Sequence, residues 1–169
     1  MKNKKTLLAI LAHPDDETFG MGGTLALYAR KGVDVQLITA TNGDVGEVAA
    51  NYLKGYKSVA DRRISELKCA AKLLGISGLH FLNYRDSGMA GTPDNKNPKA
   101  LAAQPLEKVA AQVAHLIREI KPQVVITFDP IGGYYHPDHI ASHKAAVLGF
   151  KLAADKKFKD KLSPWQASK

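Results

Sequence analysis

Two short clusters of histidine and aspartate each follow an apolar run of the chain. The run 6–12 leads directly into HPDDE at 13–17, and HPDH at 136–139 follows the run 124–128. Carboxylates crowded at the end of a buried element repel one another and are costly to desolvate, so a fold tolerates them where a cation or a reaction uses them. Two predicted strand ends therefore offer imidazole and carboxylate groups suited to a divalent metal.

The elements that must position these clusters alternate along the chain. Apolar runs interleave with helical patterns, which predicts an α/β fold of the Rossmann-like, three-layer type with a mostly parallel sheet. In such a sheet the active site lies beyond the carboxyl ends of the strands, and the loop 83–104 is long enough to be functional. The expected strands are 6–12, 34–39, 79–82 and 123–128, and the expected helices are 24–31, 59–74, 106–120 and one that begins near Pro137.

Composition favours a single compact domain over residues 1–169. The formal net charge is +8, but the lysines gather near the two ends and are not interleaved with aromatic residues, which argues against a nucleic-acid partner. The lone Cys69 cannot form an internal disulfide, so a reducing, cytoplasmic location is expected. No apolar run approaches the length of a membrane span.

Several motifs in order resemble the LmbE-like or PIG-L-like zinc N-deacetylases, which remove acetyl groups from N-acetylglucosamine-type sugars. The resemblance covers nearly the whole chain, and the pairing of HPDDE with HPDH is its most specific part. A DSGM segment with Asn95 beyond it looks more particularly like the deacetylases and amidases of the mycothiol and bacillithiol pathways. The matching segments are AHPDDE at 12–17, GMGGT at 20–24, Arg62-Arg63 with Glu66, DSGM at 86–89 and GGYYHPDH at 132–139.

The resemblance implies a role for each residue of the two clusters. By it, the ligands of one zinc ion per chain are His13, Asp16 and His139, although Fe²⁺ or another divalent ion could occupy such a set. It also implies that Asp15 is the general base and that His136 and Tyr134 stabilise the oxyanion. We further expect Asp138 to raise the pKa of His136 and to orient its ring.

Three other residues are expected at the substrate, which the resemblance implies is an N-acetylated aminosugar conjugate. Arg63 could hold hydroxyl or phosphate oxygens, Asp86 could bind sugar hydroxyls, and Glu47 is a weaker candidate. Each of them could instead serve a helix-face ion pair or a turn. The alternatives for the whole chain are a catalytically silent metal- or nucleotide-binding protein, suggested by the glycines at 20–23, and an amidase of a thiol-sugar conjugate.

Two features depart from the family pattern. Tyr135 stands where glycine is common, which could narrow the pocket or oppose an unusual backbone angle. Family members also usually continue well past the equivalent of Trp165. We therefore expect the carboxyl-terminal part of the usual family domain to be missing, which would expose a sheet edge or apolar face and favour a homo-oligomer.

Overall fold

The sheet of the molecule is entirely parallel. A computed structural model describes residues 4–167, and in that part of the chain four strands pair in the order β3-β2-β1-β4. The strands are β1 (Thr6–Leu11), β2 (Asp34–Thr41), β3 (Gly78–Tyr84) and β4 (Val124–Ile126). The helices are α1 (Asp16–Arg30), α2 (Val59–Leu74), α3 (Leu106–Ile120), α4 (Gly132–Tyr135) and α5 (Pro137–Ala154), with 3₁₀ turns η1 (Ala50–Leu53), η2 (Pro93–Lys96) and η3 (Leu101–Ala103).

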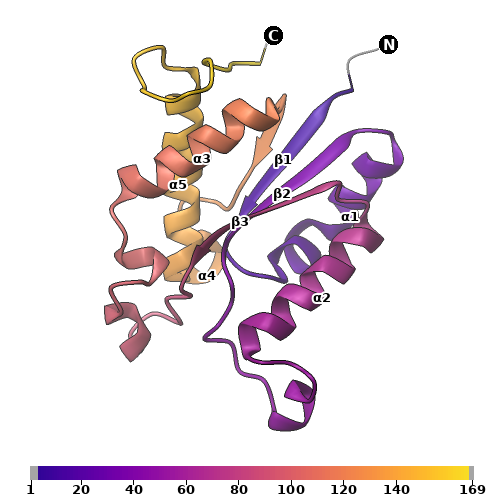
Figure 1. The fold of residues 1–169 in the computed structure, drawn as a ribbon, viewed down its shortest axis with the longest axis vertical. Coiled ribbons are helices and arrows are strands. Elements are labelled where there is room, and N and C mark those ends of the chain that lie inside the picture. Colours follow the sequence, from indigo (N-terminus) through magenta and orange to yellow (C-terminus); the bar gives the residue numbers. More distant parts are fainter. Residues whose placement is uncertain (1–3, 168–169) are drawn as a thin grey trace.

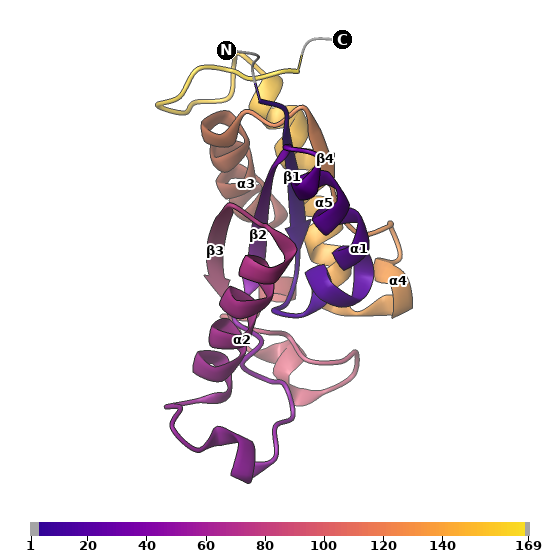
Figure 2. The ribbon, with the colours of Figure 1, turned by 90° about the vertical axis from the view of Figure 1, so that its right-hand side faces the viewer.

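Helices cover both faces of this sheet, so the predicted three-layer α/β fold is confirmed. In Figures 1 and 2, α1 and α2 lie on one face while α3 and α5 lie on the other. Strand β1 supplies both cores, because its side chains alternate between the faces. Leu8 and Ile10 pack into the core shared with α3 and α5, whereas Leu7, Ala9 and Leu11 pack into the core that also contains Leu25 and Leu67.

The first helix begins earlier than the sequence indicates. We expected a helix over 24–31, but α1 starts at Asp16, because the carbonyl of Asp15 already accepts hydrogen bonds from the backbone of Thr18 and Phe19. The glycine-rich segment lies inside the helix. Glycine destabilises a helix interior, and the helix is interrupted at Met21, where φ is −151°. HPDDE therefore runs directly from β1 into the first turn of α1.

Strand β4 is shorter than the predicted 123–128. The hydroxyl of Thr127 donates to the carbonyl of Ile10, and this side-chain bond replaces the backbone ladder at that level. Past this point the chain leaves β1 and forms α4 and the start of α5. The predicted helices over 59–74 and 106–120 are confirmed, as is the helix beginning near Pro137.

Candidate metal centre and active site

The two histidine–aspartate clusters meet at the carboxyl edge of the sheet. Strand β1 lies between β2 and β4. The chain continues from β1 into α1 on one face of the sheet and from β4 toward α5 on the other (Figure 1), which opens a crevice beyond the ends of these two strands. HPDDE enters this crevice from β1, and HPDH enters it from the segment after β4. His13, His136 and His139 are all buried, with adjacent rings whose centroids lie 4.6–5.2 Å apart.

His13, Asp16 and His139 bring two imidazole nitrogens and the two oxygens of one carboxylate close together, and we call these three residues the donor triangle. His139 Nε2 lies 3.3 Å from His13 Nδ1 and 3.3 Å from Asp16 Oδ1, while His13 Nδ1 lies 3.5 Å from Asp16 Oδ2. Ligands bound tetrahedrally at about 2.0–2.1 Å from a metal are roughly 3.3–3.4 Å apart. Two imidazoles and a carboxylate at this spacing fit a divalent metal such as zinc.

The outer nitrogens of both imidazoles are occupied in a way that suits metal binding. His13 Nε2 lies 3.1 Å from Asp138 Oδ2, and His139 Nδ1 lies 3.2 Å from the carbonyl of Gly132. Both acceptors favour a proton on the outer nitrogen, which leaves the inner nitrogen with a free lone pair. The His139 ring also stacks on Phe128, with centroids 3.9 Å apart, so its plane is fixed.

The electrostatics of this group favour a cation between the three residues. Burial opposes a charge on His13, yet hydrogen bonds to Asp138, Asp16 and Asp86 hold its pKa well above the usual value. Burial likewise opposes ionisation of Asp16, but hydrogen bonds to His13 and His139 hold its pKa well below the usual range. The group therefore binds positive charge strongly, whether that charge is a proton or a metal ion.

Other donor groups surround His13. His136 also brings a ring nitrogen within 4.8 Å of nitrogens of His13 and His139, and Asp86 and Asp138 approach the opposite side of the His13 ring. The triangle with Asp16 differs from these groups in combining two imidazoles with a carboxylate that lies 3.3–3.5 Å from both of them. His136 instead uses Nδ1 to accept a hydrogen bond from the backbone of Asp138.

That hydrogen bond corrects the expected relation between Asp138 and His136. A backbone N–H can only donate, so His136 Nδ1 carries no proton and Nε2 is the protonated nitrogen. The carboxylate of Asp138 lies against His13 instead of His136. The Asp138 charge does raise the pKa of His136 as expected, but burial and then the nearby His13 outweigh it and lower that pKa to about 4. His136 is thus a neutral hydrogen-bond donor at the first turn of α5.

Asp15 occupies a strained position at the mouth of the site. Its φ of 137° is rare for a residue with a side chain, and such strain persists where surrounding contacts impose it. Arg63 imposes it here, because Nη2 donates to the carbonyl of Pro14 at 2.8 Å and to Asp15 Oδ2 at 3.0 Å, while Nη1 donates to the carbonyl of Gly43. Burial raises the pKa of Asp15 and the Arg63 charge opposes that rise.

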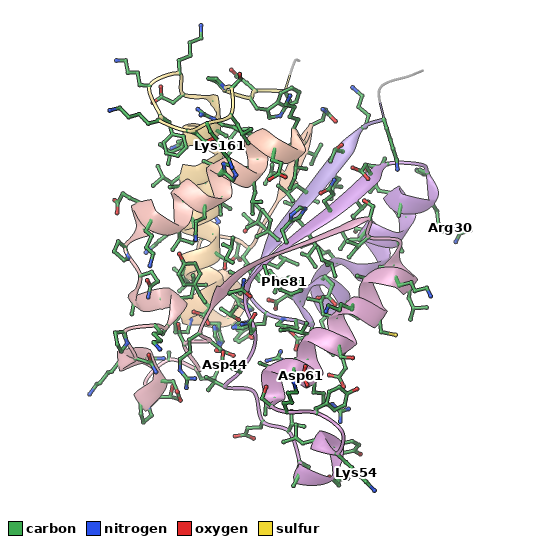
Figure 3. The ribbon with its side chains drawn as sticks, in the orientation of Figure 1. Arg30, Asp44, Lys54, Asp61, Phe81 and Lys161 are labelled. Carbon is green, nitrogen blue, oxygen red and sulfur yellow. The ribbon has the colours of Figure 1, made fainter. Side chains whose placement is uncertain are left out.

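The remaining predicted residues line one cavity of about 580 Å³ together with His13 and His136. Arg63, Asp86, Glu47 and Tyr134 all border it, although much of the Arg63 guanidinium is already engaged by the loop that carries Asp15. A second hollow of about 610 Å³ lies along β3 and includes none of the clustered histidines. Figure 3 labels Asp44, whose carboxylate binds the side chain of Arg85 and the backbone of Asp86.

Two residues of the site carry no chemical signature in the sequence. Ser87 is fully buried and binds the carboxylate of Asp138, and Phe128 stacks on His139. Phe128 reads only as the last residue of an apolar run. The signal for Ser87 is its place in the DSGM segment at 86–89, which resembles the family without indicating what the serine does. Tyr135, which stands where glycine is common in the family, has the left-handed φ of 66° that glycine adopts most easily. Its side chain is exposed.

Two curated relatives of this chain are deacetylases with the same name. The chain is 44% identical over 174 residues to a 1D-myo-inositol 2-acetamido-2-deoxy-alpha-D-glucopyranoside deacetylase of Rhodococcus erythropolis, with 98% of this chain and 59% of the relative covered. The deacetylase of the same name from Streptomyces avermitilis is 42% identical, with 98% and 60% covered. The chain spans about 60% of the length of these curated relatives.

A solved structure shows the same arrangement of elements. N,N'-diacetylchitobiose deacetylase from Pyrococcus horikoshii superposes with a TM-score of 0.80 at 27% identity, covering 99% of this chain and 59% of that protein. The sequence model described as "PIG-L: GlcNAc-PI de-N-acetylase" matches residues 8–148, which include both histidine–aspartate clusters. The chain therefore belongs to the PIG-L family.

Proposed function

We propose that this chain carries the catalytic centre of a metal-dependent deacetylase, which hydrolyses the N-acetyl amide of a glucosamine-type sugar conjugate and releases acetate. The observation that carries this proposal is the arrangement around one cavity. A three-donor set for a metal lies beside a carboxylate and a neutral imidazole donor that are not needed as ligands. Hydrolysis of an amide needs both of those additional groups.

The metal ligands in this proposal are His13, Asp16 and His139, and zinc is the ion that two imidazoles and a carboxylate favour. Once bound, such an ion lowers the pKa of a water molecule and polarises the amide carbonyl. The sequence resemblance assigned the same three residues. Their mutual distances of 3.3–3.5 Å support the assignment.

Asp15 is the proposed general base. Its carboxylate borders the cavity and is oriented by Arg63 through a 3.0 Å hydrogen bond. It takes one proton from the attacking water as the oxygen bonds to the carbonyl carbon, and then gives that proton to the nitrogen when the carbon–nitrogen bond breaks. The second proton of the water stays on the new carboxyl group and passes to the amine or to solvent, so the products are acetate and the protonated amine, or acetate, the free amine and one released proton.

His136 and Tyr134 are the proposed donors to the oxyanion. His136 has its proton on Nε2, the nitrogen that is not engaged by the backbone of Asp138, and it is neutral because its pKa is lowered to about 4. A neutral donor needs no proton uptake before the reaction. Burial raises the pKa of Tyr134, so its phenol also keeps a proton to donate. Asp138 is proposed to act through His13, and its carboxylate lies away from the oxyanion.

The proposed substrate is an N-acetylated aminosugar conjugate of the kind that names the curated relatives, with an inositol aglycone as the leading candidate. Asp86 and Glu47 border the cavity and could accept hydrogen bonds from sugar hydroxyls. Arg63 contributes mainly by holding Asp15, so its contact with substrate is secondary. A thiol-sugar amide would undergo the same reaction. Comparing the rates of hydrolysis of an N-acetyl aminosugar conjugate and of a thiol-sugar amide separates the two activities.

A silent nucleotide-binding protein is the other candidate from a different class. The glycines that suggested it lie inside α1, and the residues before them are acidic. A phosphate group beside Asp15, Asp16 and Glu17 would be repelled. The proposal of a hydrolase therefore explains the clustered residues better.

The test is acetate release from N-acetylglucosaminyl-inositol by metal-assayed protein, alongside chelated protein, Asp15→Asn and His136→Ala. We expect metal-dependent release that falls at least about 100-fold in each variant while the bound metal is retained. Release by chelated protein would contradict the proposal, as would full activity of Asp15→Asn.

Two expectations from the sequence remain proposals, namely the cytoplasmic location and the homo-oligomer. Among residues 4–167, no helix has the length and apolarity that crossing a membrane requires. Val124 in the edge strand β4 is 51% exposed, which is consistent with association through that edge. Light scattering on the 169-residue chain measures the oligomeric state directly, and a stable monomer would contradict the second proposal.

A further inference from the structure

The loop after β3 reaches the metal centre through one buried serine. Ser87 has no exposed surface, and it gives two hydrogen bonds to the carboxylate of Asp138: its hydroxyl donates to Oδ1 and its backbone N–H donates to Oδ2 at 2.8 Å. Asp138 itself is completely buried. Because both carboxylate oxygens are held by donors from a single residue, the plane of the carboxylate is fixed.

This fixed carboxylate faces His13. Asp138 Oδ2 lies 3.1 Å from His13 Nε2 and accepts the proton of that nitrogen, which leaves Nδ1 pointing at Asp16 and His139. The rotation and the tautomer of the His13 ring thus depend on where Asp138 is held. No other described side chain donates a hydrogen bond to the Asp138 carboxylate except the His13 ring itself.

We propose that Ser87 is a positioning residue of the metal centre, which acts through Asp138 to hold His13 in the tautomer and orientation that bind a divalent metal. This inference rests on the metal site of the proposed function. Ser87 is neither a member of the donor triangle nor a lining residue of the cavity, although its chain neighbours Asp86 and Gly88 border that cavity. Its hydroxyl donates only to Asp138, so the hydroxyl reaches the metal site through that carboxylate. It therefore alters metal affinity without belonging to the ligand set.

A purely structural role for Ser87 must be separated from this one. Its hydroxyl oxygen also accepts a hydrogen bond from the backbone of Ala102 at 2.9 Å, so Ser87 ties η3 to the loop as well. Loss of that bond would lower stability without changing the metal site. The decisive measurement is consequently the affinity for Zn²⁺, compared with the unfolding temperature of the metal-free proteins.

The experiment measures Zn²⁺ dissociation constants by competition with a chromophoric chelator for the wild type, Ser87→Ala, Asp138→Asn and the double variant. Loss of a direct partner of a ligating histidine typically weakens metal binding 10–100-fold, and we expect Ser87→Ala to weaken it about 10-fold. In the Asp138→Asn background we expect no further loss, because the carboxylate through which Ser87 acts is absent.

Ser142→Ala is the matched control. Ser142 is also buried, on α5 one turn beyond Asp138, and its hydroxyl has no hydrogen-bond partner within the described residues. We expect an unchanged zinc affinity. Ser87→Thr and Ser87→Val form a second pair with matched shapes, of which only the first keeps the hydroxyl. A tighter site in Ser87→Thr than in Ser87→Val supports the proposal even if Ser87→Ala folds poorly.

Three outcomes would overturn it. Equal zinc affinity in the wild type and Ser87→Ala would overturn this inference alone and leave the proposed deacetylase intact. An equal loss of zinc affinity from Ser87→Ala with and without the Asp138 carboxylate would show that Ser87 does not act through Asp138. A wild-type chain that binds no zinc would overturn the metal site of the proposed function and this inference with it.

Discussion

At Asp15 the backbone conformation and the acid–base chemistry depend on the same partner. Arg63 bonds the carbonyl of Pro14 and the carboxylate of Asp15, and its third bond reaches Gly43 in the loop after β2. Two loops of the site, one after β1 and one after β2, therefore share one guanidinium. A residue that sequence analysis places at the substrate instead holds the proposed base in a backbone conformation that it would otherwise avoid.

We predict that Arg63→Met moves the acidic limb of kcat/KM to higher pH. Burial raises the pKa of Asp15 and the Arg63 charge lowers it, so removing that charge raises the pKa further. A base with a higher pKa is protonated, and inactive, up to a higher pH. About half of the Asp15 side chain is exposed, so solvent screens part of this effect and the shift is smaller than for a fully buried pair. The measurement is a pH–rate profile.

Arg62→Met is the control for that profile. Arg62 precedes Arg63 on α2 but pairs with Glu66 on the helix surface. We expect its acidic limb to match that of the wild type, and Arg63→Lys to shift the limb less than Arg63→Met because it keeps the charge. An acidic limb that stays in place in Arg63→Met would mean that Asp15 does not limit the reaction at low pH.

A second prediction for single residues distinguishes the metal ligand Asp16 from His136, the proposed hydrogen-bond donor to the oxyanion. Asp16→Ala should lose the bound metal, because it removes the carboxylate of the donor triangle, whereas His136→Ala should retain the metal and lose activity. Atomic absorption on the purified variants gives the metal content. Loss of metal in His136→Ala with retention in Asp16→Ala would instead select the group of His13, His136 and His139 as the site.

At the scale of elements, one buried arginine closes the end of α5. The guanidinium of Arg118, on α3, donates to carbonyl groups at the carboxyl end of α5 and in the segment that follows it, and the side chain is only 2% exposed. The accepting carbonyls belong to Leu152, Ala153, Asp155, Phe158 and Leu162. These include groups that a helix end leaves without partners, and the positive charge suits the helix dipole. Arg118 thus secures α5, whose other end carries the site.

We predict that Arg118→Met destabilises the protein by roughly 2–4 kcal/mol, because buried carbonyls lose their donors. Urea unfolding followed by circular dichroism measures this change. The control is Arg30→Met at the end of α1, where the side chain is exposed and points away from the molecule (Figure 3), and a change within about 0.5 kcal/mol is expected. Equal effects of the two variants would mean that the carbonyls are solvated without Arg118.

For the whole molecule, a bound metal would join segments that the sheet alone holds together. Its proposed ligands lie just after β1 and in the first turn of α5, and these two segments are separated by more than a hundred residues of chain. A ligand that binds only the folded state stabilises it by mass action. Metal binding therefore links the chemistry of the site to the stability of the domain.

We predict that chelation lowers the unfolding temperature. At a free metal concentration of 100 times Kd, binding contributes about 2.7 kcal/mol, which corresponds to roughly 5–10 °C for a domain of this size. Differential scanning calorimetry with and without EDTA measures the shift. Asp15→Asn should show the same shift as the wild type, and Asp16→Ala should show none. A shift that persists in Asp16→Ala would point to a different ligand set.

Much of this protein could be predicted from patterns with a direct physical basis. Apolar runs of strand length between helical periodicities determined the α/β class, and glycine after Leu74 fixed the end of α2. The two clusters after β1 and β4 indicated a metal, because such crowding of carboxylate and imidazole is costly without one. Helix boundaries near the glycines of α1 were wrong, since local propensity could not anticipate the hydrogen bonds that start the helix at Asp16.

The partners of each site residue were decided by the tertiary structure. The strand order brings Asp138 beside His13 and leaves His136 with a backbone partner, and it turns Arg63 toward Asp15. Sequence spacing suggested that the Asp138 carboxylate pairs with His136, because it could compare only neighbours along the chain. Residue types determine which chemistry is available, whereas hydrogen-bond partners across loops depend on where parallel strands end, and only the folded sheet fixes that arrangement.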